Sequence, residues 1–338
     1  MRWKKAAASA ALALAMVVVS VGSYLAVGLL RGGMGSVEHP SSSLVPLPGT
    51  IYVTQGGAIY RLRNGSFKQI TPDAGWTQPA ISPDGTRLVA VKRSVNSSDL
   101  YLLDTGGKIL AQLTRNSVRR ADLNHWAFYP RFSADGSAVL YSYDPKDPYN
   151  TYRVDLAIFS RPADPLAGVA TRWTLPDLYT GGDADPVPLK RALIFTRYSI
   201  DDQSQVHSQV WLQARPGSPG VALTAAADDC AQPAVSPDER RLAMVCRHGD
   251  TRSADLEVAA LDLSSVSIGA PASLFNGELL ASPAFSPDGQ SLAFLAPAPP
   301  GGPFQLWTVP GFGQVTAPRQ ITQNLGFDSS SAPVWVQP

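Results

Sequence analysis

The chain has 338 residues, of which 44% are hydrophobic and 16% charged, with 29 Pro and 28 Gly. This composition favours many short strands over a helical or disordered protein. The net charge is +1, but four of the basic residues lie in the first 31 residues, which contain no acid. The rest of the chain therefore carries 24 basic and 27 acidic side chains, a net charge of −3. Without a Lys/Arg block to follow a phosphate backbone, nucleic acid is excluded as the expected partner.

A long uncharged segment follows a basic tip at residues 1–5. It runs from Ala6 to Leu30, 25 residues, and as a helix it would cover about 37 Å, more than the roughly 30 Å of a hydrocarbon core. Because a signal peptide has an apolar region of only about 7–15 residues, we predict a transmembrane anchor at 6–30, with a cleaved signal peptide as the alternative. Basic residues before the span predict a single-pass membrane protein with a cytoplasmic N-terminus and the rest outside the cytoplasmic membrane.

Residues 31–49 are rich in Gly, Ser and Pro and show little periodicity. This composition is typical of a flexible or extended spacer. We therefore expect the folded domain to span residues 50–338.

A motif recurs through that domain. The stretch QPAISPDGTRLVAV, residues 78–91, is echoed by YPRFSADGSAVLYS, DPVPLKRALIFT, QPAVSPDERRLAMV, SPAFSPDGQSLAFL and APVWVQP. The prolines that open the copies are Pro79, Pro130, Pro186, Pro233, Pro283 and Pro333, at intervals of 51, 56, 47, 50 and 50. Two further apolar runs complete each unit, and four strands in about 50 residues are typical of a β-propeller blade.

The turn inside each copy has a physical basis. In the first copy Pro83 sets φ near about −65°, Asp84 can bond local backbone groups, and Gly85 tolerates positive φ. The apolar runs on either side are therefore expected to pair as antiparallel strands.

The two ends of the domain predict how the ring closes. The segments GTIYVTQ, AIYRLR and FKQIT supply a second, third and fourth strand, and SAPVWVQP at the C-terminus supplies a first strand. Together they make one shared blade, which avoids unpaired strand edges. The prediction is an all-β, six-bladed β-propeller after one N-terminal transmembrane helix. An open β-sandwich, or two smaller sheets, would leave the regular spacing unexplained.

The repeats resemble those of the TolB-like propeller family, which carry a Ser-Pro-Asp-Gly turn before an apolar strand. The turn is complete at residues 82–85 and 286–289, departs at one position at 133–136 and 236–239, and is lost at 189–191. The resemblance covers about residues 50–338 and is to the family, not to TolB itself, which has another domain before its propeller. It implies a propeller fold, and the family includes partner-binding periplasmic scaffolds, regulatory domains of serine peptidases and a few sugar lyases.

Three common enzyme motifs are absent from the sequence. There is no Gly-x-Ser-x-Gly elbow, phosphate-binding Gly loop or His-Glu-x-x-His pair, so we predict no catalytic residue and no cofactor. His125, His207 and His248 are expected on one face, where family lyases hold a metal, and a lyase-like carbohydrate-active enzyme is the alternative. Because these histidines lie on different blades, and metal ligands must lie within about 2.0–2.6 Å of one point, we predict no metal site.

The same face collects aromatic, basic and acidic side chains of the kind that anchor protein or saccharide contacts. Ordinary polar propeller loops would give a similar composition. We predict a non-enzymatic binding or scaffold module of a bacterial envelope, whose partners are the membrane and another envelope protein or a saccharide. The predicted binding residues are Trp76, Arg119, Arg120, His125, Trp126, Tyr129, Tyr179, Asp183, Asp185 and Asp229.

Cys230 and Cys246 flank the hairpin whose turn is at Pro237-Asp238. In an antiparallel hairpin with this turn, the numbers of two directly opposed residues add up to about 476. The numbers of the two cysteines add up to the same value, so the cysteines are expected to lie opposite each other. A cross-strand disulfide is therefore predicted for an exported domain. Two buried, unbonded cysteines one register step apart remain the alternative.

Overall fold

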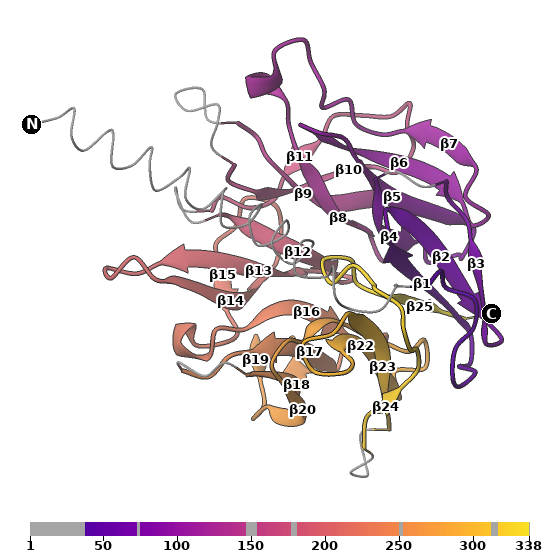
Figure 1. Ribbon diagram of the computed structural model, residues 1–338. Coiled ribbons are helices and arrows are strands. Elements are labelled where there is room, and N and C mark those ends of the chain that lie inside the picture. The colour runs from indigo at the N-terminus through magenta and orange to yellow at the C-terminus, as the bar shows by residue number, and fades with distance from the viewer. Residues whose placement is uncertain are drawn as a thin grey trace, which may run out of the picture. The chain divides into compact units, whose positions relative to one another are not determined.

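The computed structural model describes residues 38–72, 75–146, 154–176, 181–249, 253–311 and 317–337. In these residues the chain forms six antiparallel sheets, with helix limited to the short 3-10 turns η2 (Ala121–Leu123) and η3 (Ala226–Asp228). The fold is thus an all-β, six-bladed β-propeller, as predicted (Figure 1). We number the blades 1 to 6 in chain order.

Each blade is described from its innermost strand outwards. Blade 1 contains β25 (Val334–Val336), β1 (Thr50–Gln55), β2 (Ala58–Arg63) and β3 (Ser66–Gln69). Blade 2 contains β4 (Trp76–Ile81), β5 (Arg87–Arg93), β6 (Ser98–Asp104) and β7 (Ile109–Gln112). Blade 3 contains β8 (Ala127–Phe132), β9 (Ala138–Tyr143), β10 (Ala157–Pro162) and β11 (Thr171–Arg172).

The second half of the ring is built in the same way. Blade 4 contains β12 (Asp183–Pro188), β13 (Leu193–Ile200), β14 (Val206–Gln213) and β15 (Gly220–Ala222). Blade 5 contains β16 (Ala231–Val235), β17 (Arg241–Cys246), β18 (Ala254–Asp262), β19 (Ser267–Ile268) and β20 (Ala272–Gly277), of which β19 and β20 both pair with β18. Blade 6 contains β21 (Ala281–Phe285), β22 (Ser291–Pro297), β23 (Phe304–Pro310) and β24 (Arg319–Gln320).

The ring is closed by its own two ends. β25 pairs antiparallel with β1, with Ile51 opposite Trp335, which confirms the predicted shared blade (Figure 1). The Trp335 indole is 7% exposed and donates to the Pro48 carbonyl at 2.8 Å. Closure therefore buries a large aromatic side chain besides pairing the strand edges.

Residues 38–49, which the sequence assigns to the spacer, contact the propeller. The Ser43 N–H donates to the Gly65 carbonyl at 2.9 Å, and the Leu44 N–H donates to the Ile321 carbonyl at 2.7 Å. Leu47 packs against the apolar cluster between blades 6 and 1. The folded unit accordingly begins at Glu38, twelve residues before the predicted domain boundary.

The predicted single-pass membrane topology needs correction. Within the described ranges, which begin at residue 38, no helix is long and apolar enough to cross a bilayer. The segment at 6–30 on which that prediction depended lies outside these ranges, as does the basic tip at 1–5.

Apolar clusters fill the spaces between neighbouring blades. One contains Tyr52 and Ile59 of blade 1 with Trp76 and Leu88 of blade 2, all buried. Successive residues of β5 point to opposite faces, so Leu88 and Ala90 join this cluster, whereas Val89 and Val91 join the cluster between blades 2 and 3. Full burial of an apolar side chain contributes roughly 1.5–3 kcal/mol, so packing between blades stabilises the ring.

Candidate functional site

The innermost strands share a local irregularity that shapes the centre of the ring. In blades 2 to 6 their register with the second strand shifts by one residue at a β-bulge. The residue before the opening proline adopts positive φ, which is uncommon for non-glycine residues. These residues are Gln78 (φ 51°), Tyr129 (52°), Asp185 (50°), Gln232 (55°) and Ser282 (59°).

Hydrogen bonds link these positions from one blade to the next. Four of the backbone N–H groups at or beside the bulges donate to a side-chain oxygen of a neighbouring blade. At these four bulges the backbone N–H thus has an acceptor, and the bond ties two blades together at the axis. The pairs are Gln78 N with Ser331 Oγ (2.9 Å), Tyr129 N with Gln78 Oε1 (2.8 Å), Gln232 N with Thr196 Oγ1 (3.0 Å) and Ser282 N with Gln232 Oε1 (2.8 Å).

This polar ring encloses a small axial cavity of about 20 Å³. Room for about one water molecule requires roughly 10–15 Å³, so the cavity is far smaller than a typical substrate pocket. Tyr129 and Asp185, both predicted as binding residues, line it together with Arg131 and Gln232. Arg131 was not predicted, although it directly follows an opening proline and so lies on an innermost strand.

The charged groups at the axis perturb one another. Burial raises the pKa of Asp185 to about 6, against the lowering effects of the Arg131 charge and of a hydrogen bond from Thr196 Oγ1 at 3.2 Å. Burial also lowers the pKa of Arg131 and raises the pKa of Tyr129. The axis is thus a polar, poorly hydrated site in which one carboxyl group titrates near neutrality.

Two predicted binding residues belong to the interior instead. Trp76 is 1% exposed and packs edge-on against Tyr101, with ring centroids 5.4 Å apart, so it is a core residue. Asp183 has a fully buried side chain, and it receives two hydrogen bonds from the Arg197 guanidinium at 2.7 and 2.8 Å. A buried, bidentate pair of this kind fixes the strand in place and offers no contact surface.

The loop between β7 and β8, here the β7–β8 loop (residues 113–126), keeps its predicted exposed side chains. Arg119 is exposed, and Arg120 is exposed but forms an ion pair with Asp122 at 2.6 Å. Val118 beside them is 48% exposed. The tip therefore presents an apolar side chain next to two arginines.

Buried asparagines hold the base of the β7–β8 loop. Asn116, 3% exposed, donates from Nδ2 to the Ser98 carbonyl at 2.6 Å, and its N–H donates to Asp99 Oδ1 at 2.8 Å. Asn124, 4% exposed, accepts the Val118 N–H at 2.7 Å. These bonds fix the loop at its base and at its tip before any partner binds.

The aromatic residues after the loop pack on blade 3. His125 stacks on Tyr143, with ring centroids 5.1 Å apart, and its Nδ1 lies 2.7 Å from the Asp144 carbonyl oxygen. Trp126 stacks on Phe128 at 5.7 Å. Both are partly buried, so they support the loop and keep one edge at the surface.

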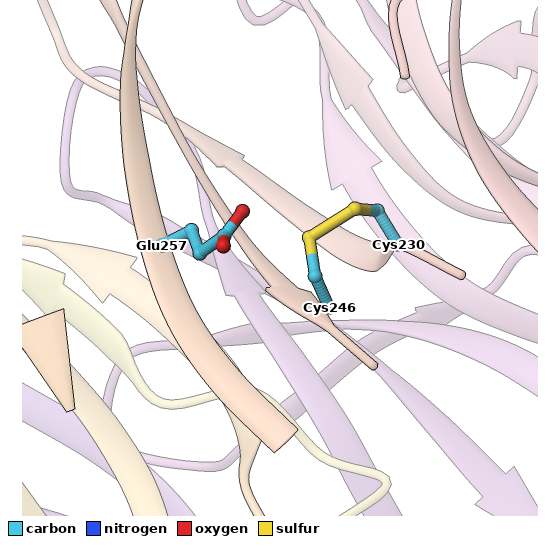
Figure 2. A group of neighbouring side chains, drawn as sticks. All are labelled: Cys230, Cys246 and Glu257. Atoms are coloured by element: carbon cyan, nitrogen blue, oxygen red, sulfur yellow. A yellow bond between two sulfur atoms is a disulfide. The ribbon is translucent and has the colours of Figure 1, made fainter. Parts of the chain in front are cut away.

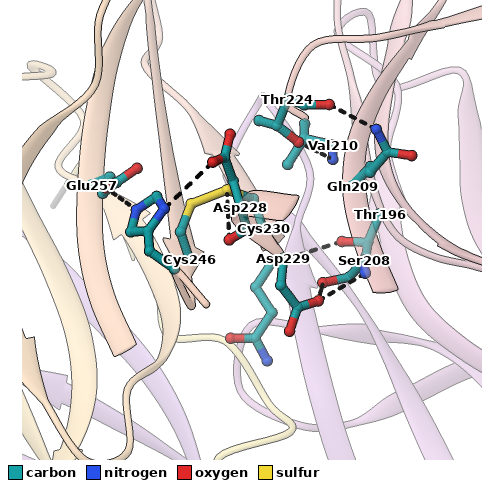
Figure 3. The surroundings of a disulfide bond; sticks show 12 residues. Thr196, Ser208, Gln209, Val210, Thr224, Asp228, Asp229, Cys230, Cys246 and Glu257 are labelled. Carbon is teal, nitrogen blue, oxygen red and sulfur yellow. Dashed lines mark hydrogen bonds and ion pairs between the residues drawn. A yellow bond between two sulfur atoms is a disulfide. The ribbon is translucent and has the colours of Figure 1, made fainter. Parts of the chain in front are cut away.

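The last two predicted binding residues have different outcomes. Asp229 adopts positive φ after η3, and its Oδ1 accepts from the Ser208 N–H at 2.8 Å and from Ser208 Oγ at 2.6 Å (Figure 3). It therefore links blades 4 and 5 at their boundary. Tyr179 lies outside the described residues.

The three histidines considered for a metal are each held locally. His125 contacts the Asp144 carbonyl, His207 Nε2 lies 2.9 Å from Asp201 Oδ2, and His248 Nε2 lies 2.7 Å from Glu257 Oε1. In the described part of the chain, the one group of three or more possible metal ligands within 4.8 Å of one another contains no histidine. The arrangement that the enzyme alternative needs is therefore not formed by these residues.

That group is Cys230, Cys246 and Glu257, and its two cysteines form a disulfide with a Cα–Cα distance of 4.0 Å (Figure 2). The sulfurs are bonded to each other, so they supply no thiolate to a metal. Glu257 is 7% exposed and accepts a hydrogen bond from His248 Nε2. This bond is the largest cause of the raised pKa of His248. The disulfide joins the strands of one hairpin beside this hydrogen-bonded His248–Glu257 pair.

Comparisons with known proteins support the fold. No family model matches the sequence, and no curated protein matches it. TolB from Acinetobacter baumannii is similar in structure, with a TM-score of 0.62 and 19% identity over 86% of this chain and 67% of that one. A putative TolB from Agrobacterium tumefaciens has a TM-score of 0.50 and 21% identity over 71% and 82% of the two chains.

A gluconolactonase from Xanthomonas campestris is also similar, with a TM-score of 0.51 and 14% identity over 85% of this chain and 90% of that chain. Likenesses at such low identity establish the shared propeller fold alone, because unrelated functions occur on one fold. The function has to be argued from the residues of this chain.

Proposed function

We propose that the chain is a non-enzymatic binding module that recognises a protein partner through the β7–β8 loop. The observation that carries this proposal is the combination of a locked base with an exposed tip. Asn116 and Asn124 satisfy the loop backbone from buried positions, whereas Val118, Arg119 and Arg120 face solvent. A loop ordered in advance loses little conformational entropy on binding.

The composition of the tip indicates the chemistry of the partner. Arg115, Arg119 and Arg120 stand against the single carboxylate of Asp122 in this loop, so its net charge is positive. Arginine is enriched at the energetically important positions of protein interfaces and pairs with carboxylates through two parallel hydrogen bonds. The proposed partner therefore presents an acidic surface with an apolar contact for Val118.

The axis supports the same proposal. Its cavity of about 20 Å³ is too small for a sugar or peptide substrate, and Gln78 and Gln232 in its wall are used in the ring of hydrogen bonds between blades. Binding at the surface therefore fits the geometry better than turnover inside the ring.

The test is affinity capture with the full chain as bait from cells that produce it. The variant Arg119→Glu/Arg120→Glu reverses two charges at the tip, and Arg63→Glu/Lys68→Glu is the matched control. The control residues flank the β2–β3 turn, which joins a third strand to a fourth and so emerges on the opposite face of the ring.

We expect the loop variant to lose its partner at least about 10-fold, equivalent to about 1.4 kcal/mol, while the control retains it. Circular dichroism melting curves will confirm that both variants are folded. Equal recovery of the same proteins by the wild type and the loop variant would remove the loop from the proposal.

A further inference from the structure

A cleft of about 520 Å³ opens between blades 3 and 4. It is lined by the β8–β9 turn of blade 3 and by the β12–β13 and β14–β15 turns of blade 4. Because turns between first and second strands emerge opposite the β7–β8 loop, this cleft lies on the other face from the proposed partner site. Its volume falls within the roughly 300–1,000 Å³ of small-molecule sites.

At two other blade boundaries an arginine side chain occupies the corresponding space. In blade 2, Arg87 Nη2 donates to the carbonyl of Gly136 in the next turn at 3.3 Å. In blade 5, Arg241 Nη1 donates to the carbonyl of Gly289 in the next turn at 3.0 Å. Both arginines follow the repeated turn directly and occupy the gap between blades.

Two sequence departures coincide at the boundary between blades 3 and 4. The position of Arg87 and Arg241 is taken in blade 3 by Ala138, which is too short to cross to the next blade. The β12–β13 turn is also shorter: it closes between Leu189 and Ala192, four residues, whereas the turn of blade 2 runs over the six residues 82–87. One change removes a bridging side chain, and the other shortens the turn that it would reach.

The cleft that results has an apolar floor. Leu140 and Leu189 are 4% and 8% exposed, and Trp173 lies beside them. The Trp173 indole N–H is buried and has no acceptor among the described residues, so this wall also holds an unsatisfied donor.

The rim of the cleft is cationic. Lys190, Arg191 and Arg215 are exposed, and among the described residues no carboxylate oxygen lies within 4.0 Å of their side-chain nitrogens. The Lys190 backbone N–H donates to Glu239 Oε1 at 2.8 Å, so Glu239 lies next to the rim, bonded to the main chain. The one acid on the wall, Asp135, accepts the Ser137 N–H at 3.0 Å and the Ser137 hydroxyl at 2.8 Å. Three cations thus surround an apolar hollow that contains one carboxylate, itself already hydrogen-bonded.

We propose that this cleft binds a small amphipathic anion. Its apolar body would lie against Trp173 and the two leucines, and its carboxylate or phosphate group would be held by Arg191 and Arg215. Guanidinium groups favour such planar or tetrahedral oxyanions because they donate in pairs. This inference is independent of the proposed partner site, since it concerns different residues on the opposite face.

The experiment is calorimetric titration of the full chain with three eight-carbon probes: octanoate, octyl phosphate and 1-octanol. We expect saturable binding of one octanoate or octyl phosphate per chain, and at least about 10-fold weaker binding of octanol. The tighter of the two anions identifies the preferred head group. Octanol binding as tightly as both anions would overturn the proposal.

Two variants separate charge from space. Arg191→Ala/Arg215→Ala is expected to weaken anion binding at least about 10-fold. Ala138→Phe fills the cleft without changing its charge, because residues 138 and 140 point to the same side of β9, and it is expected to abolish binding. Arg63→Ala/Lys68→Ala removes two cations elsewhere on this face and is expected to bind as the wild type does. Wild-type affinity in both cleft variants, when melting curves show them folded, would contradict the assignment.

Discussion

Removal of the Cys230–Cys246 bond is expected to lower the free energy of unfolding by about 3 kcal/mol. The two cysteines are 16 residues apart, and closing a loop of about that length costs the unfolded chain roughly 10 cal/mol/K, or about 3 kcal/mol at 25 °C. For a domain of roughly 300 residues, with about 2 cal/mol/K of unfolding entropy per residue, this corresponds to a shift of about 5 °C in Tm.

The assay is guanidinium unfolding of the full chain, followed by tryptophan fluorescence, with and without a reductant. Cys230 and Cys246 are 1% and 0% exposed, so alanine at both positions would also remove buried sulfur atoms. Reduced wild type keeps those atoms and isolates the effect of the bond, and Cys230→Ala/Cys246→Ala serves as the second measurement. The same unfolding midpoint for oxidised and reduced protein would refute the reasoning.

Three further predictions concern the ring. Burial raises the pKa of Asp185 to about 6 from its ordinary 3.8. The contribution of this group to stability is therefore complete below pH 3.8 and is lost as the pH rises through about 6. Asp185→Asn should make the urea unfolding midpoint less dependent on pH between pH 4 and 7. Asp183→Ala removes the carboxylate that receives two hydrogen bonds from the largely buried Arg197 guanidinium, and chemical unfolding should show a loss of about 3–5 kcal/mol. Trp335→Ala at the closing blade should cost about 3–5 kcal/mol by the same assay, whereas Trp126→Ala, on the loop, should cost clearly less.

The blade count followed from the sequence because the turn chemistry recurs at nearly constant spacing. Gly85 has φ +71°, and Asp84 Oδ1 accepts the Thr86 N–H at 3.1 Å, as the turn motif predicts. The bond from Ser82 Oγ to Asp84, with others from Thr86, lowers the pKa of Asp84 to about 2. Such local bonds are encoded within a few residues, so they can be read without knowing the rest of the fold.

Side-chain roles at the predicted site were harder to obtain from the sequence. Trp76 and Trp126 each lie just before or at the start of an innermost strand, yet the first is enclosed by the neighbouring blade and the second is partly exposed. Which of two similar tryptophans faces the interior depends on packing between blades, and a single repeat does not contain that information. The buried position of Asp183 could not be read from the sequence for the same reason, since its partner Arg197 lies on another strand.

The axial residues had a signal that composition alone did not reveal. Gln78, Tyr129, Asp185, Gln232 and Ser282 each lie directly before an opening proline, at the bulge and in positive φ, and Arg131 directly follows one. The cleft also had a signal in the sequence, namely the shortened turn at 189–192 together with Ala138. Its meaning required the structure, because only the bridges made by Arg87 and Arg241 show what those two changes remove.

The most direct test of the central claim, that the chain binds a protein partner through the β7–β8 loop, is site-specific photo-crosslinking in the cells that make it. A photoreactive residue replaces Arg119 in one sample and Arg63, on the opposite face, in another. The account predicts a discrete crosslinked protein from position 119 that is absent from position 63. Identical products from the two positions, or no product from position 119 although the protein is folded and expressed, would contradict it.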